Sequence, residues 1–216
     1  MKLVDLTHPI RSGVPSYTGG SAPEFTPRAT FETKGRMSTT IAMGTHTGTH
    51  VDAPLHFIFG GTTIADLPLE RVAGMATLLD VSSLPCSNRI IDPQAFNALA
   101  ESFPPGDIAL VYTGVDALYG TAAYSAQYPC LATESVRWLI QKGIRAYATD
   151  AISVDLMDQP GFENHQMLLG AGIPLVEGVN NLKSVGRDRF FFLALPLMLA
   201  GLEAAPARAV ALLDLE

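Results

Sequence analysis

Three of the five histidines in this chain lie within eleven residues of one another, together with one carboxylate. They are His46, His50 and His56, and the carboxylate belongs to Asp52. Imidazole and carboxylate groups without cysteine are the ligands that zinc and neighbouring transition metals take in hydrolytic sites. The stretch therefore predicts a metal centre. The competing interpretation is a turn rich in threonine and glycine that carries three surface histidines.

The spacing of these side chains requires a bend in the chain. All four have even numbers, so an extended segment would turn them to one side, and the glycines, threonines and proline around them disfavour a helix. In a straight strand, His46 and His50 would lie about 13 Å apart. That is at or beyond what one metal can bridge with Zn–N bonds of about 2.0–2.1 Å. We expect the bend at Gly48, where it costs least.

Strands and helices must position this stretch, and the chain alternates between them. Asp92 and Pro93 favour the start of a helix that ends near residue 102, and Thr133 is expected to cap a second helix that ends at Gly143. A third, short helix is expected over residues 163–169. Apolar runs predict strands at residues 3–6, 25–33, 38–43, 76–81, 108–113, 145–149, 173–176, 190–195 and 207–213, the second and third of them joined by a hairpin turn at 33–36.

The 216 residues are expected to form one domain, 1–216, of the α/β class. Strands outnumber helices, which favours a mixed sheet or barrel-like core flanked by a few helices. Residues 114–130 are expected to be a long loop. His8, which precedes a proline, is expected to be a hydrogen-bonded structural histidine.

Composition excludes several classes of partner. The net charge is −7, with no cluster of lysine and arginine. The sequence therefore offers no basic patch that would bind nucleic acid or an anionic membrane. Cys86 and Cys130 form neither a zinc pattern nor a disulfide framework and are expected to be small buried hydrophobes. The longest apolar run, 190–202, is too short to span a bilayer. The first residues carry charge and are not followed by an apolar stretch, so they do not form a signal peptide, and we expect a cytoplasmic protein.

Only 16% of the residues are charged, which indicates surface that is buried between subunits. We therefore expect a homo-oligomer, a homodimer or a homotetramer, that acts on a small molecule.

The run from His46 to Phe57, His-Thr-Gly-Thr-His-Val-Asp-Ala-Pro-Leu-His-Phe, resembles the cyclase family of metal-dependent hydrolases, which includes bacterial kynurenine formamidase and isatin hydrolase. A second segment, residues 164–182, resembles another motif of the same family and holds His165 and Glu177 twelve residues apart. Taken alone, His165 would be a histidine on a helix face and Glu177 a solvated acid at a strand end. The family resemblance implies a metal role for both and a swivelling β/β/α fold.

The resemblance implies two zinc ions in each subunit, with manganese as the alternative metal. It assigns one zinc to His46 and His50 and the second to His165. Asp52 and Glu177 would bridge or lie between the two ions.

The resemblance also implies roles beyond the metal ligands. His56 takes the position of the catalytic acid/base, which would pass a proton from a zinc-activated water to the leaving nitrogen. Tyr17 falls near a substrate-contacting aromatic that is usually tryptophan in kynurenine formamidases. Phe57, Phe59 and Tyr17 would line an apolar wall for an aromatic ring, although both phenylalanines also suit the core.

The implied function is hydrolysis of N-formyl-L-kynurenine, or of a related aryl formamide, to the amine and formate. Two alternatives remain. One is ring opening of a cyclic amide or lactone, as in isatin hydrolase. Glu177 disfavours it, because the resemblance associates that branch with an amide side chain at this position. The other is a non-catalytic protein that binds a metal or a small ligand. A structural zinc site needs four closed ligands and has no use for an extra histidine such as His56.

Overall fold

A closed ring of seven strands organises the molecule, with an eighth strand at its edge. The computed structural model describes residues 1–13 and 20–214. Around the ring the order is β13-β12-β5-β8-β10-β11-β4. The first residues of β13 pair with β4 to close the ring, and its last residues pair with β1. These strands are β1 (Lys2–Asp5), β4 (His50–Asp52), β5 (Ala73–Asp80), β8 (Ile108–Tyr112), β10 (Tyr147–Thr149), β11 (Leu175–Glu177), β12 (Arg189–Pro196) and β13 (Ala204–Leu213).

The sheet is mixed, as the sequence predicts. Strands β5, β8, β10 and β11 run parallel to one another, whereas every other pairing in the sheet is antiparallel. The expectation of an α/β fold with a barrel-like core is therefore confirmed. All nine predicted strands exist, with ends that differ by at most four residues, whereas β4 lies outside the predicted strands.

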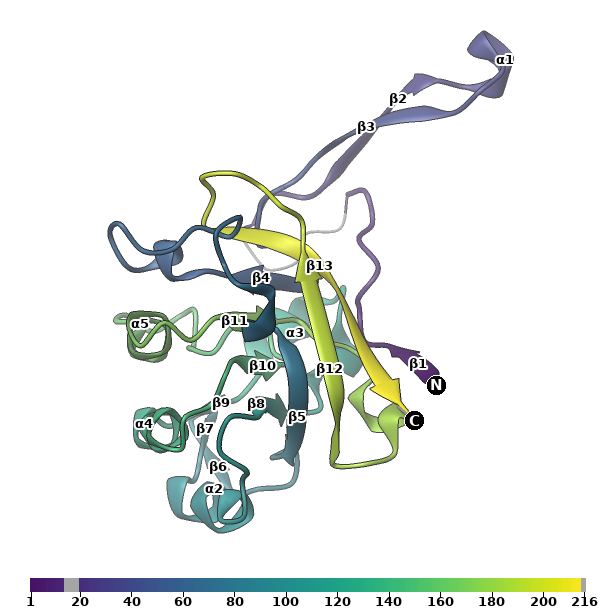
Figure 1. Cartoon of the computed structure of the whole chain (residues 1–216). Coiled ribbons are helices and arrows are strands. Elements are labelled where there is room, and N and C mark those ends of the chain that lie inside the picture. The colour runs from purple at the N-terminus through teal and green to yellow at the C-terminus, as the bar shows by residue number, and fades with distance from the viewer. Residues whose placement is uncertain (14–19, 215–216) are drawn as a thin grey trace.

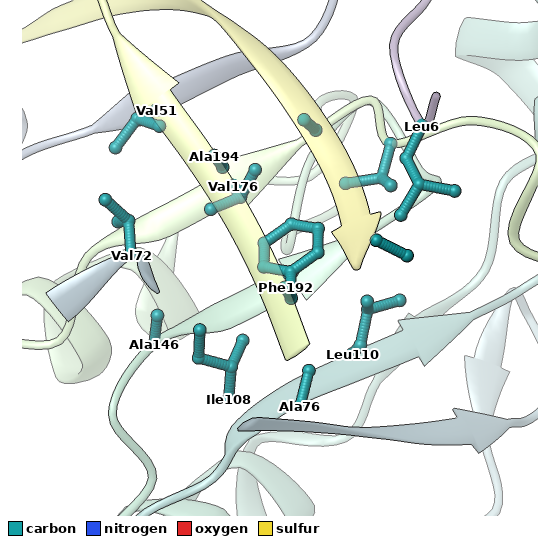
Figure 2. Close-up of a cluster of buried hydrophobic side chains, with 14 of the residues drawn as sticks. Leu6, Val51, Val72, Ala76, Ile108, Leu110, Ala146, Val176, Phe192 and Ala194 are labelled. Carbon is teal, nitrogen blue, oxygen red and sulfur yellow. The ribbon is translucent and has the colours of Figure 1, made fainter. Parts of the chain in front are cut away.

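Alternate residues of the strands fill the interior of the ring. Ile108 and Leu110 of β8 point inward, and so do Val176 of β11 and Phe192 of β12 (Figure 2). All of these side chains are fully buried. Because strand residues alternate between faces, their neighbours point outward from the ring. In β4 the inward residue is Val51, which leaves the residues on either side of it for the outer face.

Three helices cover the outer face of the parallel strands (Figure 1). They are α2 (Pro93–Ala100), α4 (Thr133–Gln141) and α5 (Glu163–Gly170), and each connects two of those strands. Asp92 caps α2 through its carboxylate and the amide of Ala95, as predicted. The predicted cap at Thr133 is wrong: Ala132 occupies that position, and the Thr133 hydroxyl lies 3.5 Å from Glu163.

The remaining elements are short, and two expectations about them are wrong. Residues 114–130 are not a plain loop, because they contain two helical turns. Cys86 is exposed, while Cys130 is buried as predicted. The short elements are η1 (Pro54–His56), η2 (Leu69–Arg71), β6 (Cys86–Ser87), β7 (Ile90–Ile91), η3 (Val115–Leu118), α3 (Ala122–Gln127), β9 (Cys130–Leu131) and η4 (Leu182–Val185).

A hairpin projects from the body of the molecule (Figure 1). It consists of β2 (Glu24–Ala29), a one-turn helix α1 (Phe31–Lys34) and β3 (Ser38–Ala42). Both strands exist, but the first ends at Ala29 instead of residue 33, and the tip is helical rather than a simple turn. Thr30 and Thr33 form a capping box there, and Gly35 ends the turn with φ 61°. Among the described residues, no helix is long and apolar enough to cross a membrane.

Candidate metal centre

The centre of the candidate site is a cross-strand pair between β4 and β11. In their antiparallel register His50 lies opposite Glu177, and Asp52 lies opposite Leu175. His50 and Asp52 flank the inward-pointing Val51, so both side chains emerge on the outer face of the ring. All three polar side chains are at least 96% buried, with exposed fractions of 3% for His50, 0% for Asp52 and 4% for Glu177.

Two changes of direction bring the other histidines to this pair. Gly48 has φ +66°, so the predicted bend between His46 and His50 is confirmed at that residue. Beyond Asp52 the chain does not stay extended, contrary to the expectation from even numbering. It turns through η1 instead, and this turn brings His56 back toward His46, with ring centroids 4.2 Å apart.

Asp52 is the common neighbour of the first two histidines. Its Oδ1 lies 2.9 Å from His46 Nδ1 and 3.3 Å from His50 Nε2. The distances are short, but neither Asp52 oxygen nor His50 Nε2 has a partner in hydrogen-bonding geometry among the described residues. The groups therefore converge on a point instead of bonding to one another.

Glu177 connects this cluster to the second motif. One of its oxygens lies 3.6 Å from His50 Nε2, and the other lies 3.6 Å from Nε2 of His165, which α5 presents in a buried position. The structure thus brings together the five residues that the resemblance implies as metal ligands: His46, His50, Asp52, His165 and Glu177.

Burial makes this cluster unfavourable without a cation. Burial raises the pKa of Glu177, the negative charge of Asp52 adds to the effect, and the result is about 8. Burial opposes ionisation of Asp52 as well, but His50 and His46 outweigh it and hold that pKa well below its usual range. Unpaired buried carboxylate oxygens are costly. Nitrogen and carboxylate donors around such oxygens fit a divalent transition metal.

Each histidine of the cluster has an outer partner that orients its ring. His50 Nδ1 lies 2.9 Å from the carbonyl oxygen of Gly48, and His165 Nδ1 lies 2.7 Å from Asp155 Oδ2. In both rings Nε2 is the nitrogen left to face the cluster. For His46 the arrangement is reversed, because Nε2 lies 3.5 Å from Glu203 and Nδ1 faces Asp52. Such partners fix the ring orientation of metal-bound histidines.

His56 lies at the edge of the cluster, closer to His46 than to His165, whose ring centroid is 5.7 Å away. Burial lowers the pKa of His56 to about 4, although the Asp52 carboxylate opposes that shift. The imidazole is therefore neutral at pH 7. His46, Asp52 and His56 can also bring ligand atoms within 4.8 Å of one another, as can His50, Asp52 and Glu177. Geometry alone thus permits His56 to be a ligand as well as a base.

A cavity of about 230 Å³ opens directly onto these groups. Polar side chains of the cluster line it together with apolar and aromatic residues, the largest of which are Phe57, Tyr119, Tyr124, Met157 and Phe162. The expected wall is therefore correct for Phe57 and wrong for Phe59, which is fully exposed. Tyr17 lies outside the described residues.

Several residues of the site have no signal in the sequence that singles them out. Asp155 and Glu203 are ordinary acids in loops, and only the fold places them beside His165 and His46. Tyr119 and Tyr124 belong to the segment that is rich in glycine, alanine and tyrosine, whose composition suggests a loop but not its contact with the cavity. Phe162 has a left-handed backbone with φ 48°, which is uncommon for a residue with a side chain and concentrates at functional sites.

The family model described as "Putative cyclase" matches residues 4–156, which include the whole histidine stretch. The chain belongs to the cyclase family. It is similar to the kynurenine formamidase of Salinibacter ruber, with 35% identity over 172 residues that are 79% of this chain and 77% of the relative.

Solved structures agree with this membership of the cyclase family. A structure titled as a potential metal-dependent hydrolase with cyclase activity is 32% identical, covers 97% of this chain and 96% of its own, and superposes with a TM-score of 0.81. An isatin hydrolase bound to the product analogue thioisatinate has a TM-score of 0.87 at 19% identity, covering 99% of this chain and 92% of its own. The latter similarity concerns the fold alone. The chain is accordingly an enzyme of the hydrolase class with a candidate metal site.

Proposed function

We propose that this protein hydrolyses the amide of N-formyl-L-kynurenine, or of a related aryl formamide, and releases the amine and formate. The observation that carries the proposal is a neutral, half-buried histidine, His56, beside the buried and unpaired oxygens of Asp52 and Nε2 of His50. The similarity to kynurenine formamidases supports the choice of the carbon–nitrogen bond.

His46, His50, Asp52, His165 and Glu177 would hold the metal, which we propose is zinc, with two ions in each subunit. Asp52 lies near His46 and His50, and Glu177 lies near His50 and His165, so each carboxylate would share the metal site with two imidazoles. When bound, zinc lowers the pKa of a coordinated water from 15.7 to about 7 and polarises carbonyl oxygens. Manganese suits the same nitrogen and oxygen donors and is the alternative.

His56 carries the proton in this proposal. Because it is neutral at pH 7, its imidazole accepts a proton from the attacking water as the oxygen bonds to the formyl carbon. It then returns that proton to the nitrogen as the carbon–nitrogen bond breaks. An aryl amine is a poor leaving group as an anion, so the proton must arrive with bond cleavage. Groups of this kind contribute about 10²–10⁴-fold to the rate.

The cavity suits a small aromatic substrate. Its volume of about 230 Å³ is below the 300–1,000 Å³ that is usual for drug-sized ligands, and its lining includes the rings of Phe57 and Phe162. A formyl group at the metal-ligating cluster would place an attached aryl ring against these side chains. Ring opening of a cyclic amide or lactone, as in isatin hydrolase, uses the same cavity and is the second candidate.

The test is N-formyl-L-kynurenine hydrolysis by protein that has been stripped with chelator and then reloaded with zinc. We expect zinc-dependent turnover that falls by at least 10²-fold in His56→Ala, while the variant binds the same number of zinc ions. Loss of a zinc ion in that variant would instead make His56 a ligand. Tight, stoichiometric zinc with no turnover of this substrate would reject the formamidase proposal.

Two controls separate the remaining alternatives. Isatin and simple lactones are tested with the same zinc-loaded protein, and turnover of these alone would favour ring opening. Failure of every substrate, with His56→Ala indistinguishable from the wild type in metal content and in ligand binding, would favour the non-catalytic alternative.

A further inference from the structure

A second cavity, of about 310 Å³, lies behind His165 as seen from the metal-ligating cluster. It is lined by the first residues of α4 and α5, two helices that lie side by side (Figure 1). His165 lines the first cavity, and its Nδ1 lies 2.7 Å from Oδ2 of Asp155, which lines the second. The two cavities are therefore neighbours, and the pair formed by His165 and Asp155 is part of the wall between them.

Phe162 is the other part of this wall. Among the described residues, it alone lines both cavities. Its half-buried ring lies beside two residues of the first cavity, with ring centroids 5.7 Å from Phe57 and 6.0 Å from His165. The ring thus stands at the boundary where the space beside the metal-ligating cluster ends.

The backbone, not the side chain, holds Phe162 at this boundary. Its φ of 48° and ψ of 46° are left-handed, a conformation that is unfavourable for a residue with a side chain. The Phe162 carbonyl oxygen accepts from the amide of Gln166 at 3.1 Å, and the Gln166 side chain donates to the carbonyl oxygen of Gly161 at 2.9 Å. Because these bonds use backbone atoms of residues 161 and 162, a smaller side chain at 162 should leave the path of the chain unchanged.

The chemistry of the second cavity restricts what it can accept. Leu131 and Leu156 give it apolar surface, while Asp155 and Glu163 give it two carboxyl groups. No lysine, arginine or histidine lines it among the described residues. An uncharged ring therefore suits this cavity, and an anionic group does not.

We propose that Phe162 sets the size limit of the substrate by closing the first cavity off from the second. The first cavity alone, at about 230 Å³, holds an aryl ring without a large substituent. With the Phe162 ring removed, the two cavities join into a space within the usual range of 300–1,000 Å³ for ligand pockets. An aryl group that bears a second, uncharged ring then reaches past Phe162 toward Leu131 and Leu156. This inference rests on the proposed function for the identity of the bond that is cleaved.

The first test is the binding of aryl amines, which are products of the proposed reaction and are not consumed by it. Calorimetry on the zinc-loaded, full-length protein compares aniline with its ortho-, meta- and para-phenyl derivatives. For at least one derivative, Phe162→Ala should lower the dissociation constant at least tenfold relative to that of aniline, because the second ring leaves water. Phe162→Leu should shift the same ratio in the same direction by less, and it replaces Phe162→Ala if that variant does not fold. No gain for any derivative in either variant would overturn the proposal.

Two control variants test where the gain comes from. Met157→Ala enlarges the first cavity without touching the second, so the ratio should change by less than about twofold. Thr133→Phe places a ring in the second cavity. Alone it should leave aniline binding and zinc content as in the wild type, and combined with Phe162→Ala it should abolish the gain. A gain that survives in the double variant, or that Met157→Ala reproduces, would show that Phe162 does not separate the cavities.

A carboxylate on the second ring gives a further check, because Asp155 and Glu163 repel it. The carboxylated amine should show none of the gain in Phe162→Ala, and an equal gain would contradict binding in the second cavity.

Turnover of the matching formamides separates this inference from the proposed function. The ratio of kcat/KM for the phenyl-substituted formamide to that for formanilide should rise at least tenfold in Phe162→Ala. If no formamide is hydrolysed but the amine ratio changes as described, the proposed function fails and the role of Phe162 stands. If the formamides are hydrolysed and neither ratio changes, the proposed function stands and the role of Phe162 fails.

Discussion

His50 and Glu177 face each other across β4 and β11, with His50 Nε2 3.6 Å from Glu177 Oε2. The pair is buried, and burial together with Asp52 raises the pKa of Glu177 to about 8. Below that pH the metal-free carboxyl group holds a proton, which a metal must displace.

We therefore predict that zinc affinity falls as pH decreases below about 8, and that zinc binding at pH 7 releases a proton from Glu177. Calorimetry in buffers of different ionisation enthalpy counts the protons released. Glu177→Gln has no such proton, so it should release about one fewer than the wild type. Equal proton release by both proteins would contradict the raised pKa.

Asp155 orients His165, and its removal should weaken the metal site without unfolding the protein. We predict that Asp155→Asn lowers zinc affinity about 10–100-fold, the range found for such outer partners. Competition with a chromogenic chelator measures this change. The Asp155 carboxylate also accepts hydrogen bonds from the backbone amides of Asn164 and His165, with N···O distances of 3.0 and 2.9 Å. The asparagine keeps an oxygen that can accept such bonds, so the start of α5 should stay folded.

The control for Asp155→Asn is Asp158→Asn, at an exposed acid that pairs with Arg89 and has no contact with the histidines. This variant should bind zinc as the wild type does. Equal losses of affinity in both variants would indicate a general effect of charge rather than the orientation of His165.

Gly48 combines a left-handed backbone with crowding. A Cβ at this residue would lie 3.2 Å from Ile10 Cγ1 and 3.4 Å from the Tyr119 hydroxyl. Gly48→Ala should lower the free energy of unfolding by more than the 1–2 kcal/mol or so that a left-handed residue costs. It should also weaken zinc binding, because the bend places His46 and His50.

Gly186→Ala is the matched control for the bend, since Gly186 has φ +70° and nothing lies within 4 Å of its Cβ position. It should show the backbone cost of about 1–2 kcal/mol alone, with zinc affinity unchanged. Denaturant unfolding and chelator competition on the same samples measure the two effects. Similar values for both glycines would mean that crowding at Gly48 is relieved by small shifts.

His8 should make the protein sensitive to acid. Its ring stacks on Tyr119 with centroids 3.7 Å apart, and its buried Nε2 has no partner among the described residues. Burial, with a smaller contribution from Arg11, lowers its pKa from 6.5 to about 4. The folded state therefore binds fewer protons than the unfolded state between these values, so stability is full above pH 6.5 and declines toward pH 4.

We predict that His8→Phe, which can keep the stack on Tyr119, removes about 2–3 kcal/mol of this acid-dependent loss. The free energy of unfolding is compared at pH 7 and pH 4.5 in the presence of chelator, so that protonation of the other histidines is common to both proteins. Parallel pH profiles for the wild type and the variant would show that His8 titrates normally in the folded state.

Local chemistry made much of this molecule predictable from its sequence. Apolar runs marked every strand of the ring except β4, and both faces of a parallel strand such as β8 are buried. Asp92 predicted the start of α2, because a capping carboxylate accepts a hydrogen bond from an amide only three residues away. The bend at Gly48 was predictable because His46 and His50 in a straight strand would lie too far apart to bind one metal ion.

The rest depended on contacts between distant segments, which no local pattern encodes. Glu203 meets His46 only because β13 pairs with β4, and Asp155 meets His165 only through a loop outside the strands. The turn at η1 overrode the alternation that even numbering suggested for His56. Phe59 looked like a pocket residue by proximity in sequence, yet the same turn leaves it in solvent.

The pairing of β4 with β13 has a consequence for the biogenesis of this enzyme. His50 lies opposite Pro206 in that pairing, so a strand made early completes its hydrogen bonds only with the last strand to be made. At about 5–20 residues per second, the ribosome needs roughly ten to thirty seconds to travel between them. Throughout that interval the histidine stretch lacks its pairing with β13. We therefore expect metal loading to follow the completion of synthesis, because a chain that is cut short before residue 204 lacks the strand that closes the ring beside the site.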